Sequence, residues 1–408
     1  MARSRFCRAA PLKPCYIGLI GLKSDLIRFN PPRFPIITNF HFNSSTSRTS
    51  NSMSVRPILR PSWRALSKFP SKRLMSRHAP PFPTIPSCPA ANCTCAPMPE
   101  FPEGLEIDHS KPLNGTMAPY AEQLLVCTGQ PDWVGRVEEE SGGDNLVADV
   151  KELVGRGGMY SDPYHNTPLT NSSFQPTTPP PYLRDVPTTS AYLLPSFTYV
   201  PLIPRSFDAV QALVKGYLLP TKLNPAHEVL SPIHQDRLKR SEAYQAFLPP
   251  AQEVEDVLVL ICGHGGRDAR CGILGPVLVK EFEGALPRAG VEVLVGPVPL
   301  ATPSKQPREA ITGPGVSEEG EELGMSARVG LISHIGGHKF AGNVILYIPP
   351  SAKLKGGDPH PLRGMGIWYG RVEPKHVEGI ITETLGEGKV IMDLFRGGVE
   401  KGKGVLRL

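Results

Sequence analysis

The clearest alternation of apolar and polar positions lies in the last third of the chain. The run DVLVLI at 256–261 is continuously apolar, which is typical of a central strand buried on both faces of a sheet. The segment 271–286 has apolar residues at helical spacing, and Pro276 is expected near the first turn of that helix, where proline does least damage. Further strands are predicted at 291–296, 343–348 and 366–372, and a further helix at 376–385.

An earlier part of the chain shows a similar series. Strands are expected at 124–127 and 190–203, and helices at 147–154 and 206–218. In the later part, the order is strand, helix, strand, followed by strand, strand, helix, which is the thioredoxin-like order. We therefore expect an α/β protein with two thioredoxin-like halves.

The chain of 408 residues is too long for one ordinary domain. Residues 1–79 lack a core pattern and are predicted to be a disordered leader. Residues 80–218 are expected to form an N-terminal domain with several cysteines, and residues 254–408 a C-terminal domain. The polar segment 219–253, with a helix expected near 235–248, connects them.

The net charge of +6 is unevenly distributed. The first 79 residues contain 15 of the 44 basic residues and one of the 38 acidic residues, so residues 80–408 carry a net charge of −8. A nucleic-acid-binding surface is therefore not expected, because phosphate binding requires clustered Lys and Arg on the folded part.

The basic leader has the composition of a mitochondrial transit peptide, rich in Arg and Ser and nearly free of acids. The stretch from Met53 resembles a complete presequence, so translation is expected to start at either Met1 or Met53. A disordered basic tail is the alternative. No stretch approaches the ~18 apolar residues of a membrane span. We expect a mitochondrial protein of the matrix or the intermembrane space.

Candidate chemistry concentrates in two loops that follow predicted strands. The stretch ICGHGGRDARCG at 261–272 contains Cys262 and Cys271, and the stretch SHIGGHKFAGN at 333–343 contains His334 and His338. Gly336 and Gly337 favour a tight loop over a helix. Neighbouring strands of one sheet would bring two thiols and two imidazoles together.

Four interpretations of these residues remain open. Two cysteines and two histidines suit a [2Fe–2S] cluster with mixed ligands or a structural zinc ion, although zinc ligands usually lie closer in sequence within each pair. A redox disulfide between Cys262 and Cys271 is the third interpretation, and unbound thiols and histidines are the fourth. His264 resembles part of a Rieske motif, but Leu274 stands where its second histidine belongs, so His264 is expected to support the site from outside.

The stretches VLICGHGGRDARCG, HIGGHKFAGN and GIWYGRV together resemble the fungal sucrase/ferredoxin-like family of thioredoxin-like ferredoxins, in particular its mitochondrial type. The N-terminal stretches CPAANCTCAPMPEFPEGLEID, LLVCTGQPDW and TNSSF are also similar to that type, so the resemblance covers roughly residues 85–408. It implies a [2Fe–2S] cluster bound by Cys262, Cys271, His334 and His338, and a role in mitochondrial redox quality control.

Such ligation implies one-electron transfer or redox sensing, with a potential that depends on pH through the second ring nitrogens of the histidines. Arg267 and Arg270 are expected either to tune the potential and dock an acidic partner or to be solvated loop charges. Trp368 and Tyr369 are expected to pack in the core. The partner is an unidentified protein redox partner or a thiol-containing client.

The remaining cysteines support a different function. Cys88, Cys93, Cys95 and Cys127 are candidate redox thiols of a thiol–disulfide oxidoreductase in which the cluster is structural or regulatory. A zinc-bound interaction domain is a further alternative. Whether the protein is an enzyme stays open, but nothing resembles the paired carboxylates of a glycosidase or a nucleotide-binding glycine motif.

Overall fold

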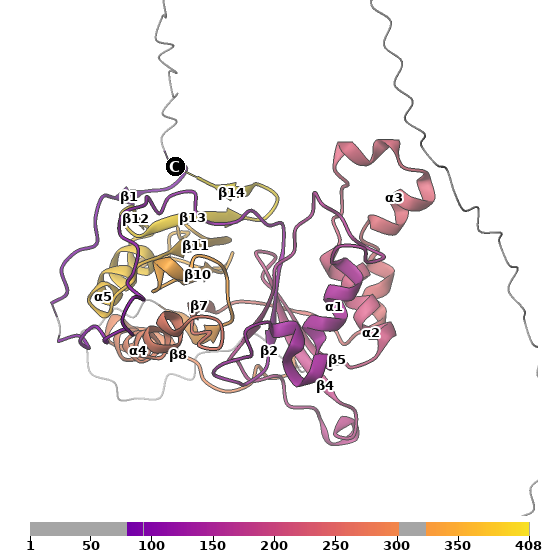
Figure 1. Cartoon of the computed structure of the whole chain (residues 1–408), viewed down its shortest axis with the longest axis horizontal. Helices are drawn as coiled ribbons and strands as arrows, with labels where there is room; N and C mark the ends of the chain where they lie inside the picture. The colour runs from indigo at the N-terminus through magenta and orange to yellow at the C-terminus, as the bar shows by residue number, and fades with distance from the viewer. Residues whose placement is uncertain (1–79, 93, 302–323, 408) are drawn as a thin grey trace, which may run out of the picture. The chain divides into compact units, whose positions relative to one another are not determined.

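The computed structural model describes residues 80–92, 94–301 and 324–407. These residues form a mixed α/β protein, which confirms the α/β class (Figure 1). The predicted leader, Cys93 and residues 302–323 lie outside the described residues. Within the described part, no helix is long and apolar enough to cross a membrane.

The C-terminal half contains the strand order β11-β10-β7-β9. Strand β7 (Val257–Cys262) pairs parallel with β9 (Met325–Ile332) and antiparallel with β10 (Val344–Ile348). Strand β11 (Met365–Tyr369) continues the sheet, and helix α4 (Ala269–Ala285) follows β7. Strand β13 (Phe395–Glu400) pairs with β11, and β14 (Gly404–Leu406) pairs with β13 at the edge of the sheet. Strand β8 (Val291–Val293) pairs with β9.

The N-terminal half repeats this order as β5-β4-β2-β3. Strand β2 (Gln123–Cys127) is parallel to β3 (Leu169–Ser172) and antiparallel to β4 (Thr188–Leu194), which pairs with β5 (Thr198–Pro204). Helix α1 (Leu146–Val154) lies between β2 and β3, and helix α2 (Phe207–Leu213) follows β5. Helices α2 and α5 (Val377–Gly379) both continue into π-helical turns, at Val214–Leu218 and Ile380–Gly386.

One antiparallel contact joins the halves into a continuous sheet. Ser172 at the end of β3 pairs with Ile332 at the end of β9. Within the halves, Cys127 is the register partner of Ser172, and Cys262 is the register partner of Ile332. Cys127 and Cys262 therefore occupy corresponding positions, each at the last residue of the first strand of its half.

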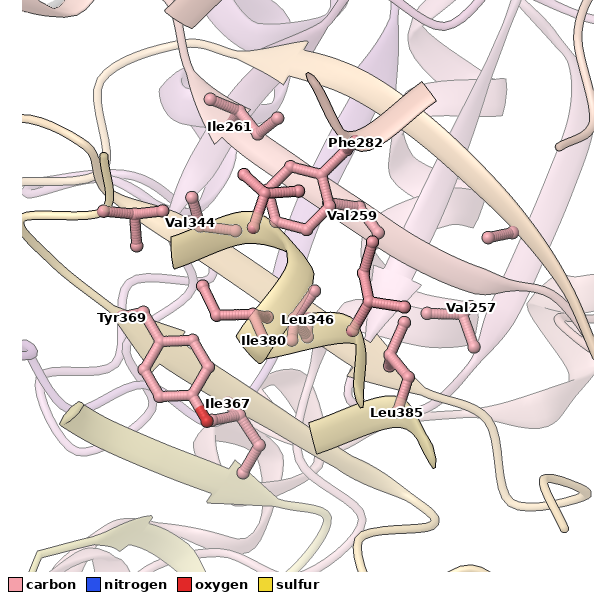
Figure 2. Close-up of a cluster of buried hydrophobic side chains, with 14 of the residues drawn as sticks. Val257, Val259, Ile261, Phe282, Val344, Leu346, Ile367, Tyr369, Ile380 and Leu385 are labelled. Carbon is pink, nitrogen blue, oxygen red and sulfur yellow. The ribbon is translucent and has the colours of Figure 1, made fainter. Parts of the chain in front are cut away.

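Three large apolar clusters fill the interior. Alternate residues of β7 face opposite sides because side chains alternate along a strand. Val257, Val259 and Ile261 face α4 and α5, where Figure 2 shows them with Phe282 and Ile380. The neighbouring Leu258 and Leu260 enter a second cluster that also holds residues of β2, β4 and β5. A third cluster lies under α1 and α2, which lie side by side in Figure 1.

The first described segment packs against the C-terminal half. Strand β1 (Thr84–Ile85) pairs with β12 (Val390–Ile391), and the backbone of Ala96 donates a hydrogen bond to Glu281 of α4. These contacts place part of the predicted N-terminal domain beside the predicted C-terminal one. The domain boundaries at 218 and 254 stay a prediction.

Several expected elements differ in detail. The single strand expected at 190–203 is a hairpin, β4 and β5, because the chain turns at 195–197. The polar strand β3 was not predicted, since it shows no apolar alternation. Pro276 lies well inside α4, eight residues into the helix, so its expected place in the first turn was wrong. The connecting segment contains α3 (Pro232–Leu238), 3₁₀ turns at Pro225–Val229 and Glu242–Phe247, and β6 (Gln252–Glu253).

Candidate functional site

The two candidate cysteines lie where β7 passes into α4. Cys262 is the last residue of β7, and its backbone N–H donates to the carbonyl of Asn343 at 2.9 Å. Cys271 lies in the first turn of α4, which Asp268 caps by accepting a hydrogen bond from the Arg270 amide. Both cysteines are buried, at 2% and 1% exposure. A thiolate at a helix N-terminus is favoured by the helix dipole.

Glycine lets the loop between these cysteines fold back onto α4. A Cβ added to Gly272 would lie 2.5 Å from the Cα of Gly265, and a Cβ added to Gly266 would lie 2.1 Å from the carbonyl oxygen of Trp133. Neither distance leaves room for a side chain. The Gly266 amide also donates to both carboxylate oxygens of Asp132, at 3.1 and 3.2 Å.

The candidate histidines lie on the loop after β9. His334 follows the strand directly, and His338 begins a 3₁₀ turn at His338–Phe340. Gly336 and Gly337 have φ of +84° and +77°, a left-handed backbone that favours glycine and turns the loop tightly. The two rings come together with centroids 5.3 Å apart. The expected loop geometry, rather than a helix, is present.

The two loops meet because their strands end together. Cys262 and Cys271 pack in one small cluster, and the His264 ring of the same loop accepts the backbone N–H of His334. The neighbouring Cys271, with help from His334, lowers the pKa of Cys262 well below its ordinary value, whereas Cys262 and burial raise the pKa of Cys271. Of the two sulfurs, Cys262 therefore loses its proton more readily.

The ring of His338 carries an unsatisfied donor or acceptor. Its Nδ1 is buried and has no hydrogen-bond partner among the described residues. An orphaned buried nitrogen is costly. A ring nitrogen left without a protein partner beside two thiols and a second imidazole fits a metal-bound group, so the donor set and this nitrogen are compatible with the expected ligation.

His264 lies two residues after Cys262 and connects neighbouring segments through hydrogen bonds. It is 1% exposed, and its Nε2 lies 3.1 and 2.8 Å from the carbonyls of Trp133 and Val134. Since carbonyls only accept, Nε2 carries the proton and Nδ1 accepts the backbone N–H of His334 at 3.0 Å. The expected supporting role is compatible with this geometry.

A segment from the N-terminal part covers the two cysteines. Ile107 packs against the small cluster formed by Cys262, Cys271 and Ala341. Basic residues of the surrounding loops hold this segment: Arg270 donates to the carbonyl of Glu106 at 2.9 Å, Lys339 pairs with Asp108 at 3.2 Å, and Arg371 donates to the Asp108 and Lys111 carbonyls.

Two polar residues near the site, Arg396 and Asn343, were not predicted from the sequence. Arg396 of β13 is 1% exposed, and its Nη1 donates to the Asn343 side chain at 2.6 Å and to the Gly336 carbonyl at 3.2 Å. Asn343 in turn donates to the Gly337 carbonyl at 3.0 Å. In the sequence, Arg396 is noticeable only as a charged residue after the apolar Leu394 and Phe395, and this pattern does not show which residues it contacts.

Two arginines and two aromatic residues near the candidate site differ in exposure. Arg270 is buried and paired with Asp268 at 2.9 Å, whereas Arg267 is exposed. Trp368 and Tyr369 are buried in the sheet, as expected of core residues.

Cys88 and Cys127 belong to different apolar clusters of the fold. Cys127 is buried in β2, and Cys88 donates to the carbonyl of His376 at 3.6 Å. Burial raises the pKa of both thiols to about 12. Cys95 is partly buried, and Cys93 lies outside the described residues. Cys88, Cys127, Cys262 and Cys271 are free thiols.

No group of three or more His, Cys, Asp or Glu side chains in the described part is arranged to hold one metal ion. The site contains one pair of sulfurs and one pair of imidazoles.

Comparisons with known proteins agree with the resemblance. The chain is similar to proteins named "Altered inheritance of mitochondria protein 32" from three yeasts, each 28% identical. The match covers 77% of this chain and 94% of the Meyerozyma guilliermondii protein, 77% and 96% for Debaryomyces hansenii, and 79% and 99% for Clavispora lusitaniae. The name of these relatives supports the predicted mitochondrial localisation. No solved structure matches the chain.

The matched family profile also includes the whole candidate site. It spans residues 113–397, which contain Cys262, Cys271, His334 and His338. Because this match covers well over half of the sequence, the chain belongs to the sucrase/ferredoxin-like family.

Proposed function

We propose that this chain is a mitochondrial [2Fe–2S] protein that acts in one-electron transfer or redox sensing. Cys262 and Cys271 would hold one iron, and His334 and His338 would hold the other. The observation that carries this proposal is the meeting of a buried thiol pair with a loop that holds two neighbouring imidazoles, one of which has an unpartnered Nδ1.

The donor types favour the cluster over zinc. Two thiolates and two imidazoles divided into like pairs match a [2Fe–2S] centre in which histidines replace cysteines on one iron, a ligation that raises the reduction potential above that of all-cysteine ferredoxins. When bound, the cluster supplies reversible one-electron chemistry.

The chain itself prepares the donors and excludes water. The Cys271 thiol and the His334 ring stabilise the Cys262 thiolate, which is the form that binds metal. The His264 ring positions the backbone of His334 by accepting its N–H. Ile107 packs against both cysteines and adds to their burial.

We also infer that both halves are thioredoxin-like. The orders β3-β2-β4-β5 and β9-β7-β10-β11 are the same, and each half places a helix between its two parallel strands. In the N-terminal half, Cys127 stands at the position of Cys262, as the register partner of Ser172, and its apolar cluster contains no second cysteine among the described residues. The N-terminal half therefore carries the scaffold without the donor set.

Thiol exchange by the N-terminal cysteines is less well supported. Thiol exchange requires thiolate, and the raised pKa of Cys88 and Cys127 leaves little of it at neutral pH. A zinc-bound interaction domain would use the same four ligands. Metal analysis distinguishes this alternative from a cluster-binding protein. The redox partner remains an unidentified protein, for which the exposed Arg267 is a candidate contact.

The test is a metal and sulfide analysis of the full chain purified without oxygen. We expect a red-brown protein with equal iron and acid-labile sulfide and a Rieske-like EPR signal after reduction. Cys262→Ser is expected to abolish the colour, while Cys127→Ser, the corresponding buried position in the other half, keeps it. A colourless wild-type protein, or one that contains zinc alone, would refute the proposal.

A further inference from the structure

Arg396 places a positive charge inside the protein without a carboxylate beside it. Its side chain is 1% exposed. Nε donates to the Thr116 hydroxyl at 3.1 Å and Nη2 to the Thr116 carbonyl at 3.2 Å, while Nη1 donates to Asn343 at 2.6 Å and to the Gly336 carbonyl at 3.2 Å. Every one of these acceptors is a neutral oxygen.

Other buried arginines in the described part of the chain each form an ion pair with a carboxylate. Arg270 pairs with Asp268 at 2.9 Å, and Arg328 pairs with Asp256 at 3.1 Å. None of the ion pairs found among the described residues includes Arg396. A buried charge without a counter-ion is strongly unfavourable, so a negative charge of another kind is needed near this guanidinium.

Asn343 connects Arg396 to the candidate site. Its side-chain oxygen accepts from Arg396 at 2.6 Å, and its backbone carbonyl accepts from the Cys262 amide at 2.9 Å. Burial lowers the pKa of Arg396 to about 10, and the neighbouring Cys262 and Cys271 oppose this shift. The positive charge of Arg396 is therefore one residue away from the end of the strand that carries Cys262.

Arg396 also contacts the loop that carries the histidines. A Cβ added to Gly337 would lie 2.5 Å from its Nη2, so the guanidinium packs directly against the loop backbone between His334 and His338. The guanidinium therefore lies against the segment that separates His334 from His338.

We propose that Arg396 is the counter-charge of the cluster site and favours its reduced state. This inference rests on the proposed function. Reduction by one electron adds one negative charge to the site, and a fixed positive charge in a buried, weakly screening environment favours the more negative state. Arg396 is a positioning residue: it touches no donor atom of the site in the described contacts, and it acts through its charge and through the histidine loop.

The test compares cluster midpoint potentials in Arg396→Gln, Arg396→Lys and the wild-type full chain, measured by spectroelectrochemical titration at one pH. Arg396→Gln is expected to lower the equilibrium constant for reduction at least tenfold, which corresponds to a fall of about 59 mV for one electron. Arg396→Lys keeps the charge and is expected to stay within threefold. Arg328→Gln, a buried arginine with its own carboxylate, serves as the matched control and is expected to leave the potential unchanged.

If the Arg396→Gln variant does not bind iron, a second variant provides the test. Asn343→Asp places a carboxylate against the guanidinium without removing it, and is expected to lower the potential in the same direction. The proposal is overturned by an unchanged potential in Arg396→Gln, by equal falls in the Lys and Gln variants, or by an unchanged potential in Asn343→Asp.

Failure of this inference is distinct from failure of the proposed function. A wild-type chain without iron and sulfide refutes the function itself, before any potential is measured. A wild-type chain with a normal cluster and an Arg396-independent potential refutes only the inference. Thermal unfolding of the metal-free variants, measured in parallel, separates a general loss of stability from the expected change in potential.

Discussion

The ring of His264 accepts a hydrogen bond from the backbone N–H of His334, with 3.0 Å between Nδ1 and the amide nitrogen. Through Nε2 the same ring donates to the carbonyls of Trp133 and Val134. One neutral imidazole therefore joins three segments: the loop after Cys262, the histidine loop and the loop after β2.

His264→Phe is expected to weaken iron binding by about 10- to 100-fold, the usual cost of removing a group that orients a metal ligand. The measurement is competition with an iron chelator. His360→Phe is the matched control, because His360 is also buried and bridges a carbonyl, Leu385, and an amide, Leu362, at 3.1 Å each. Equal loss of iron in both variants would show that His264 has no specific role.

Close backbone packing predicts opposite effects for two glycines of α4. Gly272→Ala is expected to destabilise the protein by about 1–3 kcal/mol, because its Cβ would lie 2.5 Å from Gly265. Gly284→Ala meets only Arg288 at 3.7 Å and is expected to stabilise the helix by about 0.5–1 kcal/mol. Urea unfolding of the metal-free chain measures both, and a stable Gly272→Ala variant would contradict the close approach.

Cys88 and Cys127 are expected to react slowly with alkylating reagents. Their pKa values of about 12, against an ordinary 9.0, reduce the thiolate fraction at neutral pH by about 1000-fold, since each pKa unit is a factor of ten. Iodoacetamide labelling read by mass spectrometry compares the folded chain with the same chain in urea. Rapid labelling of Cys127 in the folded chain would restore the thiol-exchange alternative.

Stability is expected to fall in mild acid. Burial lowers the pKa of His165, His360 and His376 below 6.5, so these rings stay neutral in the folded state while the unfolded chain takes up protons as the pH falls through 6.5. The free energy of unfolding should therefore decrease from pH 7 to pH 5.5.

His360→Phe tests this origin, because the variant cannot take up that proton in the unfolded state. Its free energy of unfolding, measured with urea at each pH, should change less with pH than that of the wild type. Burial raises the pKa of Glu122, which changes the free energy of unfolding in the opposite direction. Because Glu122 is present in both proteins, its contribution cancels in the comparison. Identical pH dependence in both proteins would exclude His360 as a source.

Local patterns in the sequence were sufficient to predict β7, α4, α1 and the two donor loops. The apolar run before Cys262 and the glycines around His334 and His338 depend only on neighbours in the chain, and such patterns follow from the strand and helix periods. Strand β3 and the hairpin β4–β5 were not predicted, because a polar buried strand and a short turn leave no periodic signal.

Residue types and their positions after predicted strands were enough to identify the candidate ligands, which are two cysteines and two histidines. The residues that surround these candidates could be identified only from the folded structure. Arg396 lies 134 residues beyond Cys262, and Ile107 lies 155 residues before it. Such neighbours follow from sheet register and from the packing of one segment over another, which depend on residues far apart in the chain. The correspondence of Cys127 with Cys262 likewise appears only when β3 and β9 pair at Ser172 and Ile332.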